Sequence, residues 1–153
     1  MIFITMQEII DDHAEIIHKY GGLDGIRDIG LLASAIDMPK ATLFGEYLHP
    51  TIFDKAAAYL FHIICNHPFA DGNKRTGTMA ALTFLRQNRV DIEFTEGQTL
   101  VLEELVVNTA DGKVTKEQIA KFLKECYKGP ELLEGKPGQV FNVETQEWES
   151  AVS

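Results

Sequence analysis

The residues with the clearest chemical potential form one continuous stretch of the sequence, His67-Pro68-Phe69-Ala70-Asp71-Gly72-Asn73-Lys74-Arg75. It combines an imidazole, a carboxylate and two cations. The free amides at the start of a helix attract anions, and two cations on the same turn strengthen that preference. Gly72 allows the backbone to approach a ligand closely, because it carries no side chain. The stretch therefore predicts a phosphate-binding site at Gly72, Asn73, Lys74 and Arg75.

Two more side chains of the stretch suit the transfer of a phosphate-containing group. Asp71 is its one carboxylate, and one carboxylate together with phosphate oxygens and waters is a usual arrangement for Mg²⁺. The imidazole of His67 can take a proton from an attacking hydroxyl. Phe69 is expected to anchor the loop by burying its ring. A polyphosphate held with Mg²⁺ and attacked by a hydroxyl is the chemistry that these residue types predict.

Two strongly apolar segments flank the stretch and must position it. Residues 51–66 are apolar on more than one face, which is typical of a buried central helix. Pro68 ends that helix, because the residue before a proline is disfavoured in helical backbone angles. A second apolar helix is expected from Asn73 to about Gln87. The candidate site thus lies on a tight connection between two buried helices.

Four other helices are expected. The first begins at the capping pair of Thr5 and Glu8 and ends near Tyr20, and Asp28 begins a shorter one that Pro39 ends. The last two span about 97–108 and 115–129. Residues 90–94 alternate between apolar and polar and are expected to be extended. About six helices with little strand predict an all-α helical bundle.

Residues 40–50 interrupt the helical pattern with apolar residues around Gly45, which indicates a short flap before the central helix. Phe44 and Tyr47 in this flap have two interpretations. They either pack as satellites of the core, or they let the flap add a strand to an extended target segment beside the phosphate site.

The C-terminal residues 130–153 differ from the catalytic domain expected over residues 1–129. They hold one lysine against five glutamates, a charge of 1 − 5 = −4, and glycine and proline are frequent at their start. We expect an acidic tail that is loosely held, or that docks on the domain and inhibits it.

The composition restricts the partners. Fourteen Lys and Arg against 23 Asp and Glu give a net charge of −9, which disfavours direct nucleic-acid binding. Cys65 and Cys126 both lie in apolar helical contexts, so a reducing, cytoplasmic location is expected. No apolar run approaches the ~20 residues that span a bilayer, and no membrane association is expected.

The stretch 67–75 resembles the Fic/Doc signature, His-x-Phe-x-(Asp/Glu)-Gly-Asn-(Gly/Lys)-Arg, at every constrained position. Residues 21–32, Gly-Gly-Leu-Asp-Gly-Ile-Arg-Asp-Ile-Gly-Leu-Leu, are similar to the death-on-curing branch of that family. The resemblance implies a Fic/Doc-like helical fold and a nucleotide-dependent transferase that modifies a protein hydroxyl. By the same resemblance His67 is the general base, Asp71 the magnesium ligand, and Asn73, Lys74 and Arg75 the phosphate-binding cluster.

Position 74 distinguishes the two activities that the resemblance allows. Adenylyltransferases of the family carry glycine there, whereas Lys74 resembles the death-on-curing branch, which moves the γ-phosphate of ATP. The implied target is a Ser or Thr of a translation factor similar to elongation factor Tu (EF-Tu-like), and the implied partner is an antitoxin. Adenylylation by the same loop and a noncatalytic phosphate-binding module remain the alternatives.

Two weaker patterns give further hypotheses. Residues 145–150 nearly fit the inhibitory (Ser/Thr)-x-x-x-Glu-(Gly/Asn) motif of autoinhibited members. By that resemblance Glu149 could pair with Lys74 or Arg75, and removal of the tail would then raise activity. His62 could join His67 and Asp71 as metal ligands of a hydrolase. The spacing does not place all three on one helical face, which favours a core histidine at position 62.

Overall fold

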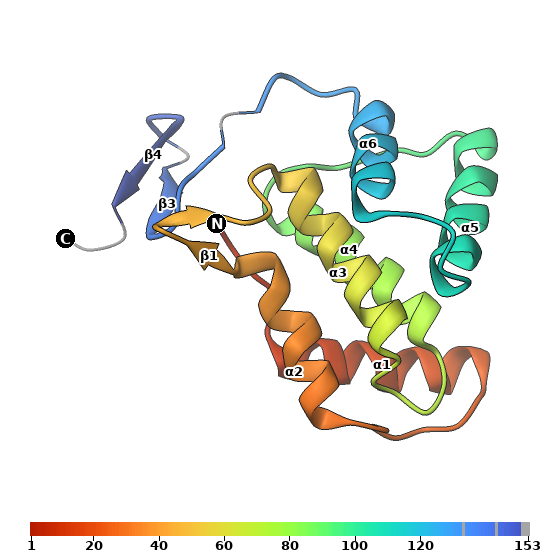
Figure 1. Ribbon diagram of the computed structural model, residues 1–153. Coiled ribbons are helices and arrows are strands. Elements are labelled where there is room, and N and C mark those ends of the chain that lie inside the picture. The colour runs from red at the N-terminus through yellow and green to blue at the C-terminus, as the bar shows by residue number, and fades with distance from the viewer. Residues whose placement is uncertain (133, 143, 151–153) are drawn as a thin grey trace.

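Six helices build the described part of the chain, which in this computed structural model comprises residues 1–132, 134–142 and 144–150 (Figure 1). The helices are α1 (Met6–Tyr20), α2 (Ile29–Asp37), α3 (Ile52–Asn66), α4 (Asn73–Gln87), α5 (Glu96–Ala110) and α6 (Lys116–Cys126). A single 3-10 turn, η1 (Met38–Lys40), follows α2. The prediction of a mostly helical protein with about six helices is confirmed.

The helix starts follow from local sequence. A threonine and the residue three positions later form a reciprocal capping box at the start of α1, α3, α5 and α6, and the threonines are Thr5, Thr51, Thr95 and Thr115. The Asp28 side chain caps α2 by accepting from the Leu31 amide at 3.0 Å. Since these caps satisfy amides that a helix itself leaves unpaired, they fix where each helix begins.

Helix α3 lies at the centre of the fold, with α2, α4 and α6 packed around it (Figure 1). Ten of its 15 residues are buried, so it has no solvent-facing stripe of the usual width. Helix α4 approaches α3 closely at Gly77, where an added Cβ would lie 3.1 Å from the Leu60 carbonyl oxygen and 3.1 Å from Ile64 Cγ1. The two helices that flank the candidate site are therefore in direct contact through a glycine.

Strands make up only two small hairpins. In the first, β1 (Thr42–Leu43) pairs antiparallel with β2 (Glu46–Tyr47), and the turn residues Phe44 and Gly45 both have positive φ, 51° and 78°. The short flap expected over residues 40–50 is thus present as a hairpin before α3. Residues 90–94, expected to be extended, form neither a helix nor a paired strand in the described ranges, and their alternation packs Val90, Ile92 and Phe94 against the core.

The second hairpin belongs to the tail, where β3 (Gln139–Asn142) pairs antiparallel with β4 (Glu147–Ser150). The tail touches the rest of the protein at several points. Glu134 Oε2 accepts from the Ile52 amide at 3.1 Å, Leu132 packs against the core, and the Arg89 guanidinium lies 4.7 Å from the centre of the Phe141 ring. Residues 133, 143 and 151–153 of the tail lie outside the described residues.

Within the described ranges, every helix is too short or too polar to cross a membrane.

Candidate active site

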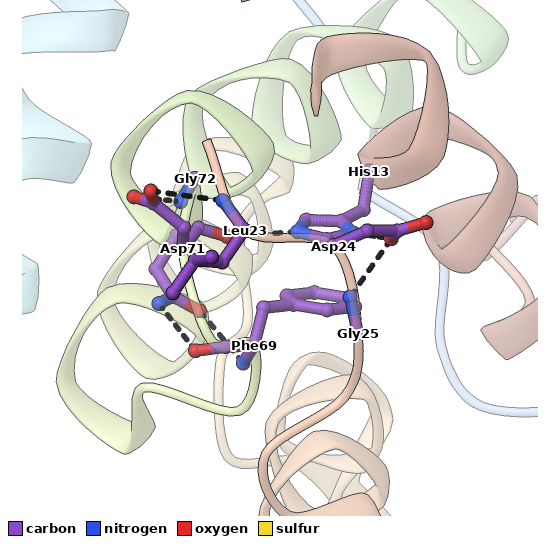
Figure 2. A network of polar contacts seen from close by, with 8 residues as sticks. His13, Leu23, Asp24, Gly25, Phe69, Asp71 and Gly72 are labelled. Carbon is purple, nitrogen blue, oxygen red and sulfur yellow. Dashed lines mark hydrogen bonds and ion pairs between the residues drawn. The ribbon is translucent and has the colours of Figure 1, made fainter. Parts of the chain in front are cut away.

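The connection between α3 and α4 carries the predicted site residues, and it packs against the C-terminal half of α1 and the segment that follows α1 (Figures 1 and 2). His67, Asp71, Lys74 and Arg75 are exposed, whereas Phe69 and Asn73 are buried. The connection thus has an outer set of reactive side chains and an inner set that holds the loop.

His67 ends α3 in the left-handed conformation, with φ 50° and ψ 54°. A non-glycine residue held there costs about 1–3 kcal/mol, so its surroundings must stabilise it. Arg27 does this from the neighbouring segment: its Nε donates to the His67 carbonyl at 2.7 Å and its Nη2 to the Asn66 carbonyl at 3.0 Å. A cation at the C-terminal end of a helix is also favoured by the helix dipole. Arg27 therefore fixes the backbone that presents His67.

The segment between α1 and α2 runs beside the loop and is tied to it by backbone hydrogen bonds. Ile26 and Phe69 form an antiparallel bridge. The Arg27 and Asp28 amides donate to the Pro68 carbonyl at 2.7 and 3.0 Å, and the Ala70 amide donates to the Gly25 carbonyl at 3.1 Å. The loop is thus one edge of a small backbone ladder.

Asn73 closes the loop from inside. Its side-chain carbonyl accepts from the Phe69 amide and its side-chain NH₂ donates to the Phe69 carbonyl, both at 3.0 Å. The Phe69 ring is fully buried. Since both polar ends of the Asn73 amide are occupied by backbone, its side chain is not free for a phosphate, and its part in a phosphate site would come from its backbone N–H.

His13 of α1 is the main contact that sequence reasoning missed. Its ring stacks on Phe69 with the centres 3.8 Å apart and the planes 7° apart, and its Nε2 lies 2.7 Å from the Asp71 carbonyl oxygen (Figure 2). The carbonyl can only accept, so Nε2 must carry the hydrogen. Asp24 lies 3.9 Å from the other ring nitrogen. The available signal was an imidazole on the apolar face of α1, flanked by Ile9 and Ile16.

The Asp71 carboxylate is exposed and held by two backbone amides. Its Oδ1 accepts from Gly72 at 2.9 Å and its Oδ2 from Leu23 at 3.3 Å (Figure 2). Gly22 makes room for it, because a Cβ there would lie 2.6 Å from Oδ2. Each carboxylate oxygen keeps a lone pair for a further ligand.

A magnesium ion fits this donor set. The described residues contain no group of three or more His, Cys, Asp or Glu side chains that could hold a metal ion by themselves. Mg²⁺ does not need such a group when it shares one carboxylate with phosphate oxygens and waters. Asp71 is placed to supply that one carboxylate.

The N-terminus of α4 differs from the starts of the other helices. Its N-cap is Gly72, with φ 78° and ψ 15°, which makes no side-chain capping bond, and its first turn, like that of α2, has no acidic residue. Lys74 and Arg75 occupy that turn instead. The Arg75 guanidinium lies 4.2 Å from the centre of the Tyr20 ring at the end of α1. Cations oppose the dipole at a helix start, whereas a bound anion would reverse that cost.

Two sequence-predicted elements are not brought to this loop. The β1–β2 hairpin lies at the opposite end of α3, which is about 22 Å long (Figure 1). Tyr47 packs there, with Lys55 Nζ 4.0 Å from its ring centre, while Phe44 is 96% exposed at the tip. Of the two interpretations of the flap, the one that places it beside the phosphate site is wrong, because the chain between α1 and α2 lies there.

Glu149 is the second such element. It lies on β4, where its Oε1 accepts from the Asn142 side chain at 3.0 Å. Figure 1 places this hairpin on the opposite side of the molecule from the α3–α4 connection. An inhibitory pair between Glu149 and Arg75 is therefore not present in this structure.

His62 belongs to a separate cluster. Lys116 Nζ lies 3.1 Å from His62 Nε2 and 3.0 Å from His49 Nε2. Burial, followed by the charges of Lys116 and His49, lowers the pKa of His62 to about 4. A neutral imidazole that accepts from Lys116 is occupied away from the loop, so the structure gives no metal-hydrolase arrangement of His62 with His67 and Asp71.

Two cavities lie elsewhere in the described part of the chain. One, of about 320 Å³, separates the tail from the body and is lined by residues that include Arg89, Tyr127 and Trp148. The other, of about 230 Å³, adjoins His49 and Lys116. Neither of these two cavities is lined by His67 or Asp71.

Comparison with known proteins gives matches over the region that carries the loop. The family model described as Fic/DOC family matches residues 3–85. Toxin Doc of Mycolicibacterium smegmatis is 47% identical over 73 residues, which cover 48% of this chain and 56% of that protein. Protein kinase doc of Escherichia phage P1 is 34% identical over 127 residues, which cover 83% of this chain and 97% of that protein.

Proposed function

Since the chain belongs to the Fic/DOC family, we propose that it is a nucleotide-dependent transferase that modifies a hydroxyl of a protein and acts as a toxin restrained by an antitoxin. One observation carries the proposal. The start of α4 has no side-chain cap and no first-turn acid, carries Lys74 and Arg75, and follows His67 and Asp71 on the same exposed loop.

The residues divide the work by their chemistry. The amides of Asn73, Lys74 and Arg75 bind the phosphates of ATP, and the two cations neutralise part of their charge. Asp71 holds the magnesium ion, which spreads the remaining phosphate charge when it is bound. His67 accepts the proton of the attacking serine or threonine hydroxyl, a contribution of typically 10²–10⁴-fold.

Phosphoryl transfer is the favoured reaction. Lys74 adds a cation at the position where adenylyltransferases of the family have glycine, so the ammonium competes for the space of a phosphate group there. The phage P1 relative, which matches over most of both chains, is named a protein kinase. The proposed substrate is a Ser or Thr of a translation factor similar to elongation factor Tu.

The reaction is identified by which phosphate of ATP is transferred. The full chain is incubated with Mg²⁺, a bacterial lysate or purified elongation factor Tu, and ATP labelled at either the α- or the γ-phosphate. We expect label from the γ-position in the target protein and a mass increase of one phosphate. Transfer of the α-label would replace the kinase by the adenylyltransferase alternative.

Replacement of His67 by alanine tests catalysis. Because the side chain is exposed, His67→Ala should leave the melting temperature unchanged and lower the transfer rate by about 10²–10⁴-fold. ATP affinity should change little, since the phosphate ligands remain. Expression of the variant should relieve growth arrest. If arrest persisted with His67→Ala, the protein would act as a noncatalytic phosphate-binding module.

A further inference from the structure

His13 is only 2% exposed and contacts the loop at two points, yet it has no part in the chemistry proposed above. A buried imidazole in an apolar helix face is unfavourable unless its nitrogens are satisfied. The partner of its Nε2 is the Asp71 backbone carbonyl inside the reactive loop, so His13 acts on the loop as well as filling space in the core. What that contact fixes is the orientation of the peptide group between Asp71 and Gly72.

The peptide group between Asp71 and Gly72 carries a C=O and an N–H, and these two groups affect a bound anion in opposite ways. It is trans, since the described chain contains no cis peptide bond, so its C=O and N–H point in opposite directions. With the Asp71 carbonyl on His13, the Gly72 N–H is directed to the other side, where it meets Asp71 Oδ1 at 2.9 Å. A rotated peptide would exchange these directions.

Gly72 makes such a rotation feasible. Its φ is 78°, and glycine can leave this conformation for several others at little cost, because it has no Cβ to restrict the backbone. The residue is also close-packed: a Cβ on Gly72 would lie 3.6 Å from Cδ2 and Nε2 of His13 and 3.2 Å from Ile17 Cδ1. The loop therefore depends on an external contact to keep one peptide orientation, and His13 supplies the hydrogen bond.

We propose that His13 is a positioning residue for the nucleotide site: its Nε2–H holds the Asp71 carbonyl away from the start of α4, so that backbone N–H groups, and no carbonyl oxygen, face the phosphates. Successive N–H groups around a left-handed residue form an anion-binding concavity. A carbonyl oxygen turned into it would repel the same anion. The inference rests on the proposed function, because it assigns His13 to that site.

The stacking of His13 on Phe69 and its hydrogen bond to Asp71 can be separated by substitution. His13→Phe keeps an aromatic ring against Phe69 and loses the donor. His13→Gln loses the ring but places a side-chain NH₂ at about the position of Nε2. His18→Phe makes the same chemical change at an exposed position of the same helix and serves as the control.

Three measurements are made on the full chain and each variant: the crystal structure, thermal unfolding, and calorimetric titration with ATP in the absence of metal. We expect His13→Phe to rotate the Asp71–Gly72 peptide and weaken ATP binding by about tenfold. His13→Gln should bind within about threefold of the parent chain, as should His18→Phe. A folded His13→Phe with the parent's peptide orientation and ATP affinity overturns the proposal.

The other outcomes also decide. If His13→Phe does not fold, His13→Gln is the test: folded with near-parental affinity it supports the role of the donor, and folded with tenfold weaker binding it overturns it. If the parent chain binds no ATP either without metal or with Mg²⁺ supplied, the proposed function fails. The crystal structures then test the contact of His13 by itself: an unrotated peptide in His13→Phe contradicts its role in holding the Asp71 carbonyl, and a rotated peptide supports that role.

Discussion

Asn73 stabilises the loop, and the adjacent Lys74 is proposed to bind phosphate. Substitution of each residue should therefore affect a different property of the protein. Asn73→Ala leaves the buried amide and carbonyl of Phe69 without partners, which should lower the free energy of unfolding by about 2–4 kcal/mol. Lys74→Ala changes an exposed side chain and should alter stability by less than about 0.5 kcal/mol while weakening ATP binding. Urea denaturation and calorimetry measure the two effects. Equal stability of the two variants would contradict the division.

At the residue scale, sequence predicts side chains whose partners lie within the same short stretch. The burial of Phe69 and the exposed cations at the start of α4 follow from the pattern of residues 67–75. The contacts of Arg27 with the His67 carbonyl and of His13 with the Asp71 carbonyl join residues 40 and 58 positions apart. No periodicity specifies such pairs, because they arise only when α1 and α2 pack beside the loop.

At the scale of the helices, Gly77 sets the distance between α3 and α4. Alanine normally favours a helix over glycine by about 1 kcal/mol, but a Cβ at this position would lie 3.1 Å from the Leu60 carbonyl oxygen. Gly77→Ala should therefore lower the free energy of unfolding by about 1–3 kcal/mol, because backbone cannot move aside as a side chain can. Chemical denaturation measures the change.

Gly97 in the first turn of α5 is the matched control. A Cβ there would meet only Thr95 Oγ1, at 4.0 Å, so Gly97→Ala should leave stability unchanged or raise it slightly. If both glycines tolerated alanine equally, close contact between α3 and α4 would not be what requires glycine at position 77.

The helices themselves were largely predictable, and the packing of the segment between α1 and α2 beside the loop was not. Threonine capping boxes mark four helix starts in the sequence, and Pro68 marks the end of α3. The apolar residues around Gly45 also indicate that the chain leaves the helical pattern over residues 40–50. Only four residues separate Tyr47 from Ile52, so chain connectivity already places that hairpin at the start of α3, whereas the loop follows the end of α3. What local patterns do not reveal is that the chain between α1 and α2 packs beside the loop.

At the scale of the whole molecule, removal of residues 130–153 shows whether the tail stabilises the fold or inhibits the enzyme. A chain ending at Gly129 loses the Glu134 contact to the Ile52 amide and the packing of Leu132, which should lower the free energy of unfolding by about 1–3 kcal/mol. Because Glu149 is held in β4, the transfer rate should stay that of the full chain. Thermal unfolding and γ-phosphate transfer measure the two quantities.

Glu134→Ala in the full chain isolates the loss of the helix-start contact and should account for part of the destabilisation. A truncated chain with increased transfer would instead indicate that the acidic tail inhibits the enzyme, as the near-match of residues 145–150 suggests.

The outward position of His67, Asp71, Lys74 and Arg75 has a consequence for control of the protein. A binding protein that covers the end of α1 and this loop would shut out ATP and the substrate protein together by steric occlusion, with no helix deformed. Inactivation of that kind is complete while the cover stays bound and is reversed as soon as it is degraded or diluted, so the amount of the covering protein alone would determine how much enzyme is active.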